Sequence, residues 1–174
     1  INISSGKWII FADADDYFTD DFLKLTNKFI NYHEDIIYFG VGGVNKKTIP
    51  TRHLRYVTLI INYLKNPINE DALRFLFLAP WGKMIKRQLI QESNIQFDKT
   101  ISSEDNLFSV KLAHKANKIS ATIEVLYYIQ ETIDSISKDW NKDHFLAKFY
   151  AAIAANQFLC SINIQIHPNQ QVDR

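Results

Sequence analysis

Three aspartates stand within four residues, directly after an apolar segment near the start of the chain. The segment, residues 7–12, reads Lys-Trp-Ile-Ile-Phe-Ala, and Asp13, Asp15 and Asp16 follow it. Carboxyls with an ordinary pKa of about 3.9 are ionised at pH 7, so these three repel one another unless a cation neutralises them. Mg²⁺ and Mn²⁺ prefer oxygen ligands and are often held by one or two carboxylates together with phosphates. The cluster therefore indicates a divalent-cation site, with a solvated acidic turn before a helix as the alternative.

A second acidic pair, Glu104 and Asp105, lies far downstream at the start of a predicted helix that Ser102 or Ser103 can cap. Acidic side chains in the first turn of a helix are favoured by the helix dipole. By itself, the pair therefore indicates no more than a helix N-terminus.

The elements that must position these residues follow from the apolar pattern. Residues 7–12 and 36–41 are short apolar runs, typical of strands covered on both faces. Residues 119–130 are rich in β-branched and aromatic side chains and predict one long strand or two short ones. Ligands of open α/β sheets bind at the carboxyl ends of strands, and the acidic cluster follows such an end.

Helical spacing of apolar residues and flanking breakers predict further helices at 20–32, 53–64, 70–78, 86–92 and 143–160. Thr19 is the expected N-cap of the first of them. The last one presents Phe145, Phe149 and Ile153 on one face, and we expect that face to pack against the rest of the protein. The pattern as a whole predicts one α/β layer structure with helical additions.

Bulk properties narrow the class of protein. The chain has 174 residues with 47% hydrophobic content, enough for one domain with a core, and 20 basic and 19 acidic residues leave a net charge of +1. That balance gives no general attraction to nucleic acid or to an anionic membrane. The single cysteine, Cys160, excludes an intrachain disulfide, and no apolar run reaches the roughly 18 to 20 residues that span a bilayer. We expect a cytoplasmic protein, or one held at the inner face of the cell membrane.

Four segments resemble, in the same order, segments of family 2 glycosyltransferases. Residues 6–18 resemble the family's metal-binding Asp-x-Asp segment. The Pro-Trp-Gly-Lys run at 80–83, the Ser-Glu-Asp-Asn-Leu-Phe run at 103–108 and the Leu-Tyr-Tyr run at 126–128 resemble its acceptor half. Each match is weak alone, but four in order are a specific signal.

The resemblance implies an α/β fold, a partial GT-A (nucleotide-diphospho-sugar transferase) fold with a mixed sheet, flanking helices and a C-terminal helical extension. We expect the metal and acceptor portion of the catalytic domain at 1–137, the extension at 138–166 and a disordered tail at 167–174. The family's nucleotide-binding half has no counterpart in this chain, so we expect the chain alone to bind donor poorly.

The resemblance also implies roles for the acidic residues. Asp13 and Asp15, with Asp16 close by, would hold Mg²⁺ or Mn²⁺ and the diphosphate of a nucleotide-sugar donor. Asp105 would be the general base that takes the proton of the attacking hydroxyl, and Glu104 would orient the acceptor or Asp105. The expected enzyme is an inverting, metal-dependent glycosyltransferase of cell-surface polysaccharide or glycoconjugate synthesis, whose acceptor is a saccharide or a lipid-linked saccharide.

Two residues of the Pro-Trp-Gly-Lys run are weaker candidates for substrate contact. Trp81 could stack on a sugar ring, and a core tryptophan is the equal alternative. Lys83 could contact phosphate or acceptor. Many relatives carry basic residues after the Tyr-Tyr pair, whereas this chain has Gln130 and Glu131, and it lacks the Gln-x-x-Arg-Trp segment of processive synthases. We therefore expect a single-transfer enzyme, with homo-oligomers or membrane contact formed by any exposed apolar face.

Two other classes of protein fit part of the sequence. An apolar strand followed by Asp-x-Asp also opens haloacid dehalogenase-like phosphatases, where Asp13 would be the nucleophile and Asp15 the acid/base. That family expects Thr or Val where this chain has Tyr17. A non-catalytic remnant or interaction domain is the second alternative.

Overall fold

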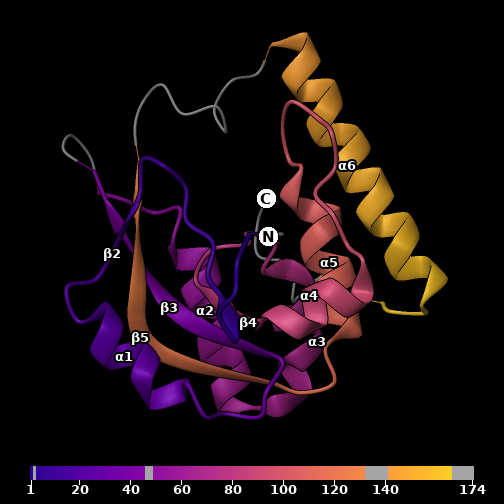
Figure 1. Ribbon diagram of the computed structural model, residues 1–174. Coiled ribbons are helices and arrows are strands. Elements are labelled where there is room, and N and C mark those ends of the chain that lie inside the picture. The colour runs from indigo at the N-terminus through magenta and orange to yellow at the C-terminus, as the bar shows by residue number, and fades with distance from the viewer. Residues whose placement is uncertain (2, 46–48, 132–140, 166–174) are drawn as a thin grey trace.

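The computed structural model describes residues 1, 3–45, 49–131 and 141–165, and Figure 1 shows a twisted sheet with helices on its two faces. In chain order its elements are β1 (Trp8–Ile9), β2 (Tyr17–Phe18), α1 (Phe22–Phe29), β3 (Ile36–Val44), α2 (Leu54–Lys65), the 3₁₀ helix η1 (Pro67–Asn69), α3 (Glu70–Leu76), β4 (Lys83–Lys86), α4 (Arg87–Ser93), α5 (Asp105–Lys115), β5 (Ile119–Gln130) and α6 (Lys142–Ser161). The expected α/β class is confirmed.

The described strands form one mixed sheet in the order β1-β4-β3-β5-β2. The central strands β3 and β5 are parallel, with Val44 opposite Gln130 at their carboxyl ends. β4 is antiparallel to both β1 and β3, and β2 is antiparallel to β5. β1 and β2 thus lie at opposite edges, and residues 10–16, which join them, cross the carboxyl ends of β3 and β5.

The core forms on both faces of β3, because its first six residues are apolar or glycine and all of them are buried. Phe39 contacts Phe29 of α1 on one face, at 5.1 Å between ring centroids. Tyr38 points to the other face and contacts Phe77, which follows α3, at 5.4 Å. The predicted strand at 36–41 is confirmed and continues to Val44, and the predicted strand at 119–130 forms as a single one.

The predicted first strand at 7–12 was too long. Only Trp8 and Ile9 pair with β4, and Phe11 makes an isolated parallel bridge to Trp81. Ile10 and Phe11 still pack against the core although neither belongs to a strand of the sheet. Their apolar character therefore reflects burial under a crossing segment, and periodicity cannot separate that from burial within a strand.

The predicted helices form, but two predicted caps are wrong. α1 begins at Phe22, its N-cap residue is Asp21 instead of Thr19, and no side chain caps it. Neither Ser102 nor Ser103 caps α5, since Glu104 is its N-cap residue and makes no side-chain capping bond. Backbone carbonyls accept the first amides instead, as when the Asn106 N–H donates to the Ser103 carbonyl at 3.2 Å.

The predicted packing face of α6 was also wrong. Its buried residues are Ala151, Ala155 and Leu159, and the last two pack with Val110 and Ala113 of α5 in a second apolar cluster. Phe145 and Phe149 are about half exposed, and their rings stack on each other at 6.4 Å. Alanines occupy the buried face of α6 because their small side chains let the backbones of α5 and α6 approach closely.

Most of the predicted extension at 138–166 is occupied by α6, and the boundary at 138 stays a prediction. The predicted tail at 167–174 lies outside the described residues. Among the described helices, none combines the length and the hydropathy needed to cross a bilayer.

Candidate functional site

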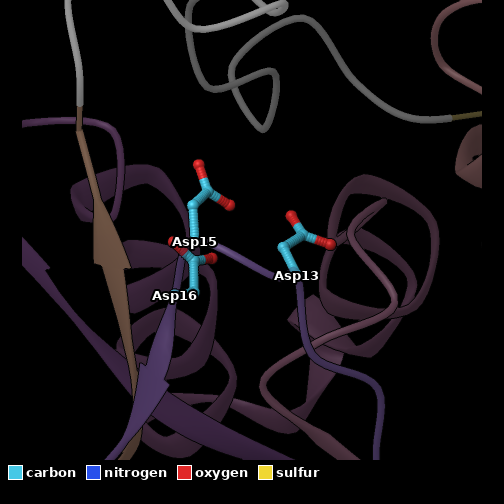
Figure 2. Close-up of side chains that lie close together, drawn as sticks. All are labelled: Asp13, Asp15 and Asp16. Atoms are coloured by element: carbon cyan, nitrogen blue, oxygen red, sulfur yellow. The ribbon is translucent and has the colours of Figure 1, made fainter.

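The acidic cluster lies in the turn that leads from the crossing segment into β2. The Asp16 N–H donates to the Asp13 carbonyl at 3.3 Å, which closes the turn. One carboxylate oxygen from each of Asp13, Asp15 and Asp16 lies within 4.8 Å of the others. Figure 2 shows the three carboxylates emerging on the same side of the turn. The sequence neighbours thus become neighbours in space with a shared open side.

Groups of the fold hold two of these carboxylates and leave the third free. The Gln130 N–H at the end of β5 donates to Asp16 Oδ1 at 2.8 Å, and the Tyr127 hydroxyl donates to the same carboxylate. The Asp13 N–H donates to the Tyr127 hydroxyl oxygen at 2.7 Å, and the Trp81 side chain donates to the Asp13 carboxylate. Asp15 is exposed, and within the described residues no protein group donates to it. Tyr127 therefore links both held aspartates.

Burial and nearby charge make the carboxyls of Asp13 and Asp16 costly to ionise. Burial first, then the charges of Asp16 and Asp15, raise the pKa of Asp13 above its ordinary value. Burial also raises the pKa of Asp16, against the hydrogen bonds from Gln130 and Tyr127. A bound cation would relieve this repulsion. Oxygen ligands of one Mg²⁺ lie about 3 to 4 Å apart, so small side-chain rotations would bring carboxylates of this cluster into ligand positions.

Asp105 reaches the same site from α5. Phe11, two residues before Asp13, contacts Phe108 of α5 edge to face at 5.8 Å, which joins the two segments. Burial first, then the adjacent Glu104 charge, raises the pKa of Asp105 to about 6, and the Asp13 charge adds to the rise. Glu104 itself is exposed. The structure thus brings the distant acidic pair beside the acidic cluster, with Asp105 the inner of the two.

Lys83 lies under this site, inside the core. It is 2% exposed, and its Nζ donates to the Phe77 carbonyl at 2.7 Å. Burial lowers the pKa of Lys83 to about 7, while the Asp105 charge opposes that shift. The expectation of a contact between Lys83 and substrate is corrected by this burial, and Lys83 acts on Asp105 as a nearby buried charge.

Trp81 is likewise a core residue, 2% exposed. Its ring stacks on Tyr127 at 5.5 Å and meets Tyr56 edge to face at 4.8 Å. No ring face is left for a sugar, so the stacking role is corrected in favour of the core alternative. The following residue, Gly82, has a φ of +66°, and a Cβ there would lie 2.8 Å from a Val41 methyl, which explains the glycine in this run.

Arg52 is a site residue that the sequence reasoning missed. Its charge lowers the pKa of both Asp13 and Asp16, which places it beside the cluster. Glu131 Oε1 fixes its backbone by accepting the N–H groups of Thr51 and Arg52 at 2.9 and 2.6 Å. No motif surrounds Arg52 in the sequence. The nearest sequence signal was Glu131, an acidic residue shortly after the Tyr-Tyr segment, whose carboxylate holds the Arg52 backbone in the structure.

The backbone of β3 closes on the same loop. A Cβ at Gly43 would lie 2.4 Å from His53 Nδ1, so only glycine allows the residues after Arg52 to approach the strand this closely. On the α5 side, Ser103 has a φ of +61°, an uncommon conformation for a residue with a side chain. Strained backbone of this kind is often found beside functional groups, and here it precedes the Glu104–Asp105 pair directly.

Comparison with known proteins identifies the class. Residues 1–93, more than half of the chain, match glycosyl transferase family 2, and the chain belongs to that family. The solved structure of S. aureus TarS 1–349 in complex with UDP-GlcNAc is 22% identical, with a TM-score of 0.61 over 88% of this chain and 44% of that chain. Its complex with UDP gives a TM-score of 0.57 at 21% identity, over 95% and 53% of the two chains. The expected GT-A type fold is confirmed.

Curated relatives agree with the family. The poly(ribitol-phosphate) β-N-acetylglucosaminyltransferase TarS of Staphylococcus aureus is 27% identical over 72% of this chain. The poly(ribitol-phosphate) β-glucosyltransferase of Bacillus spizizenii is 27% identical over 74%, and the glycosyltransferase GlyA of Streptococcus pneumoniae is 22% identical over 82%. The chain spans about a fifth of the length of these relatives. Family membership sets aside the haloacid dehalogenase-like alternative.

Proposed function

We propose that this chain carries the metal and acceptor side of a glycosyltransferase that moves a sugar from a nucleotide-sugar donor to an acceptor hydroxyl. The observation that carries the proposal is the meeting of Asp105, with a pKa raised to about 6, and the open acidic cluster of Asp13, Asp15 and Asp16. Family membership supports the reaction class.

In this proposal the protein groups divide the chemistry between them. Asp105 takes the proton of the acceptor hydroxyl while the hydroxyl oxygen forms a bond to the anomeric carbon of the sugar. The bond from that carbon to the diphosphate breaks, and the electron pair leaves with the diphosphate. Attack opposite to the leaving group inverts the anomeric centre. A pKa near 6 leaves Asp105 mostly ionised at pH 7 and still basic enough to accept a proton.

A divalent cation, Mg²⁺ or Mn²⁺, fits the open side of the cluster and would neutralise the charge that develops on the diphosphate. Asp15 and Asp13 are the proposed ligands. Asp15 has no competing hydrogen bond within the described residues, and Asp16 is already held by Gln130 and Tyr127. Arg52, beside the cluster, is proposed to contact the diphosphate directly, because a guanidinium pairs with two phosphate oxygens at once.

The relatives indicate the substrate classes. Solved TarS structures contain UDP-GlcNAc or UDP, which supports a uridine diphosphate sugar as donor. The names of two relatives state a poly(ribitol-phosphate) acceptor, which supports a hydroxyl-rich, cell-surface polymer as acceptor and work in polysaccharide synthesis. The lone Cys160 fits a reducing compartment, and we propose that the enzyme works in the cytoplasm or at the inner face of the membrane.

The test is a screen of nucleotide sugars with and without Mn²⁺ on the native protein, measured as nucleoside diphosphate release and as calorimetric binding. We expect Asp15→Ala to abolish metal-dependent donor binding. Asp20→Ala, an equally exposed aspartate on the far side of β2, should leave it unchanged. Equal donor binding by Asp15→Ala and the wild type, or binding that chelation does not weaken, would remove the metal from the proposal.

A further inference from the structure

A cleft of about 760 Å³ opens on the side of α5 that faces the loop after α4. Figure 1 shows this loop beside α5 and α6. Residues 93–99 form one wall, the second half of α5 forms the floor, and Phe158 of α6 closes one end by contacting His114 edge to face at 5.6 Å. We call this the basic cleft.

The charges of the basic cleft are one-sided. Lys99, Lys111 and Lys115 line it against a single carboxylate, Asp98. Across the described residues, none of these lysines forms an ion pair, whereas Lys86 elsewhere in the fold pairs with Asp35. Three ammonium groups against one carboxylate concentrate positive potential in the cleft, although the whole chain carries a net charge of only +1.

The basic cleft shares helix α5 with the proposed base. α5 carries Asp105 at its first turn and both Lys111 and Lys115 further along. A helix rises 1.5 Å per residue, so these lysines lie about 9 and 15 Å from Asp105 along the helix axis. The wall of the cleft also bonds to the catalytic pair, because the Asp98 N–H donates to the Glu104 carbonyl at 3.3 Å.

We propose that the basic cleft binds an anionic, phosphate-bearing stretch of the acceptor polymer, whose adjacent unit presents its hydroxyl to Asp105. The inference rests on the proposed function and names the acceptor class for that site. An extended chain could reach from the cleft, which is lined by the second half of α5, to Asp105 in the first turn of the same helix. A bilayer surface needs a flat or convex basic face, and these lysines lie on the walls and floor of a hollow.

The experiment measures binding without donor, so that it stays independent of transfer. The probe is a synthetic pentameric ribitol phosphate, with maltopentaose as the uncharged control, titrated into the native protein by calorimetry at low and at raised NaCl. We expect Lys111→Glu with Lys115→Glu to weaken binding of the anionic probe by about tenfold or more, since two attractions become repulsions. Raised salt should weaken wild-type binding as well.

The matched control carries the same change of charge at a distance. Lys24→Glu with Lys142→Glu alters two exposed lysines, one on α1 and one in the first turn of α6. Lys142 lies 16 residues, about 24 Å, along α6 from Phe158. We expect the control to bind the anionic probe within twofold of the wild type. Lys111→Gln with Lys115→Gln, which removes charge without reversing it, should give an intermediate loss, and thermal melts verify folding.

Three outcomes would overturn the inference. The anionic probe could bind the cleft variant and the wild type equally, or maltopentaose could bind as well as the anionic probe. Alternatively, the cleft variant could lose co-sedimentation with phosphatidylglycerol vesicles while keeping the pentamer, which would make the cleft a membrane contact. Loss of donor binding in Asp15→Ala is measured separately, so failure of the cleft and failure of the glycosyltransferase proposal remain distinguishable.

Discussion

The carboxylates at the two ends of β3 have pKa values shifted in opposite directions. At its amino end, Asp35 accepts Lys86 Nζ at 2.9 Å and the N–H groups of Asn117 and Lys118 at 2.8 and 3.2 Å. Burial acts to raise the pKa of Asp35, but these donors outweigh it and the pKa is lowered. At the carboxyl end, Asp13 and Asp105 have raised pKa values. Hydrogen-bond donors outweigh burial at Asp35, which serves the fold, whereas burial outweighs them at Asp13 and Asp105, which are available for chemistry.

The largest effect is expected from removing the proposed base. Asp105→Asn should lower turnover by about 10² to 10⁴-fold, the usual contribution of a general base, and leave donor binding intact. Wild-type turnover should fall about tenfold per pH unit below pH 6, because Asp105 acts only when ionised. The measurement is kcat against pH, with Asp20→Asn as the control. Normal turnover by Asp105→Asn would end the assignment.

At the amino end of β3, removing the carboxylate should change stability instead of activity. Asp35→Ala removes one ion pair and two amide acceptors, and we expect it to lower the free energy of unfolding by about 2 to 3 kcal/mol in urea titrations. Because the folded pKa of Asp35 is lowered, this contribution is present above the ordinary pKa and is lost as pH falls through the folded value. Asp20→Ala, which is exposed, should change stability by less than about 0.5 kcal/mol.

At the carboxyl end of β3, removing the charge of Asp105 should raise stability instead of lowering it. The folded pKa of Asp105 is raised from 3.8 to about 6, so ionising Asp105 lowers the free energy of unfolding. This loss is complete above about pH 6 and absent below about pH 4. Asp105→Asn should therefore be more stable than the wild type by about 3 kcal/mol at pH 7.5, and the gain should vanish near pH 3.5. Melting curves at both pH values decide it, and a destabilised variant at pH 7.5 would contradict the burial argument.

The smallest effects concern Arg52. Arg52→Gln removes a positive charge from beside Asp13 and Asp16, so Mn²⁺ alone should bind slightly more tightly, within about threefold. Nucleoside diphosphate with Mn²⁺ should bind about tenfold more weakly, because a charged phosphate contact is lost. Calorimetry of the two titrations separates these signs. Two changes in the same direction would place Arg52 outside the diphosphate contact.

Several features of the site could be predicted from the sequence because they depend on neighbours along the chain. Three aspartates within four residues must lie close together whatever the fold. The apolar runs at 36–41 and 119–130 predicted the central strands, because a strand buried on both faces needs apolar residues at nearly every position. The pairing of distant segments came from the family resemblance and not from periodicity.

Other features were decided only by tertiary packing. Trp81 and Lys83 were candidates for substrate contact because residue type alone does not show whether a side chain points into the core or into solvent. In the structure both side chains are buried in the core. α6 buries Ala151 and Ala155 and leaves Phe145 and Phe149 about half exposed, because close approach to α5 favours small side chains. Such choices depend on partners far away in the chain.

By itself, the sequence determined the local chemistry: an acidic turn after an apolar run, and an acidic pair at a helix start. The family resemblance implied that these two meet, and the tertiary structure brings it about, because β1 and β2 lie at opposite edges of the sheet and the segment between them must cross the ends of β3 and β5. The tertiary structure also supplied Arg52, which no spacing could have placed beside the cluster. The physical reason is that the local sequence shows only where the carboxylates are. Their pKa values depend on burial and on charges that the fold brings near.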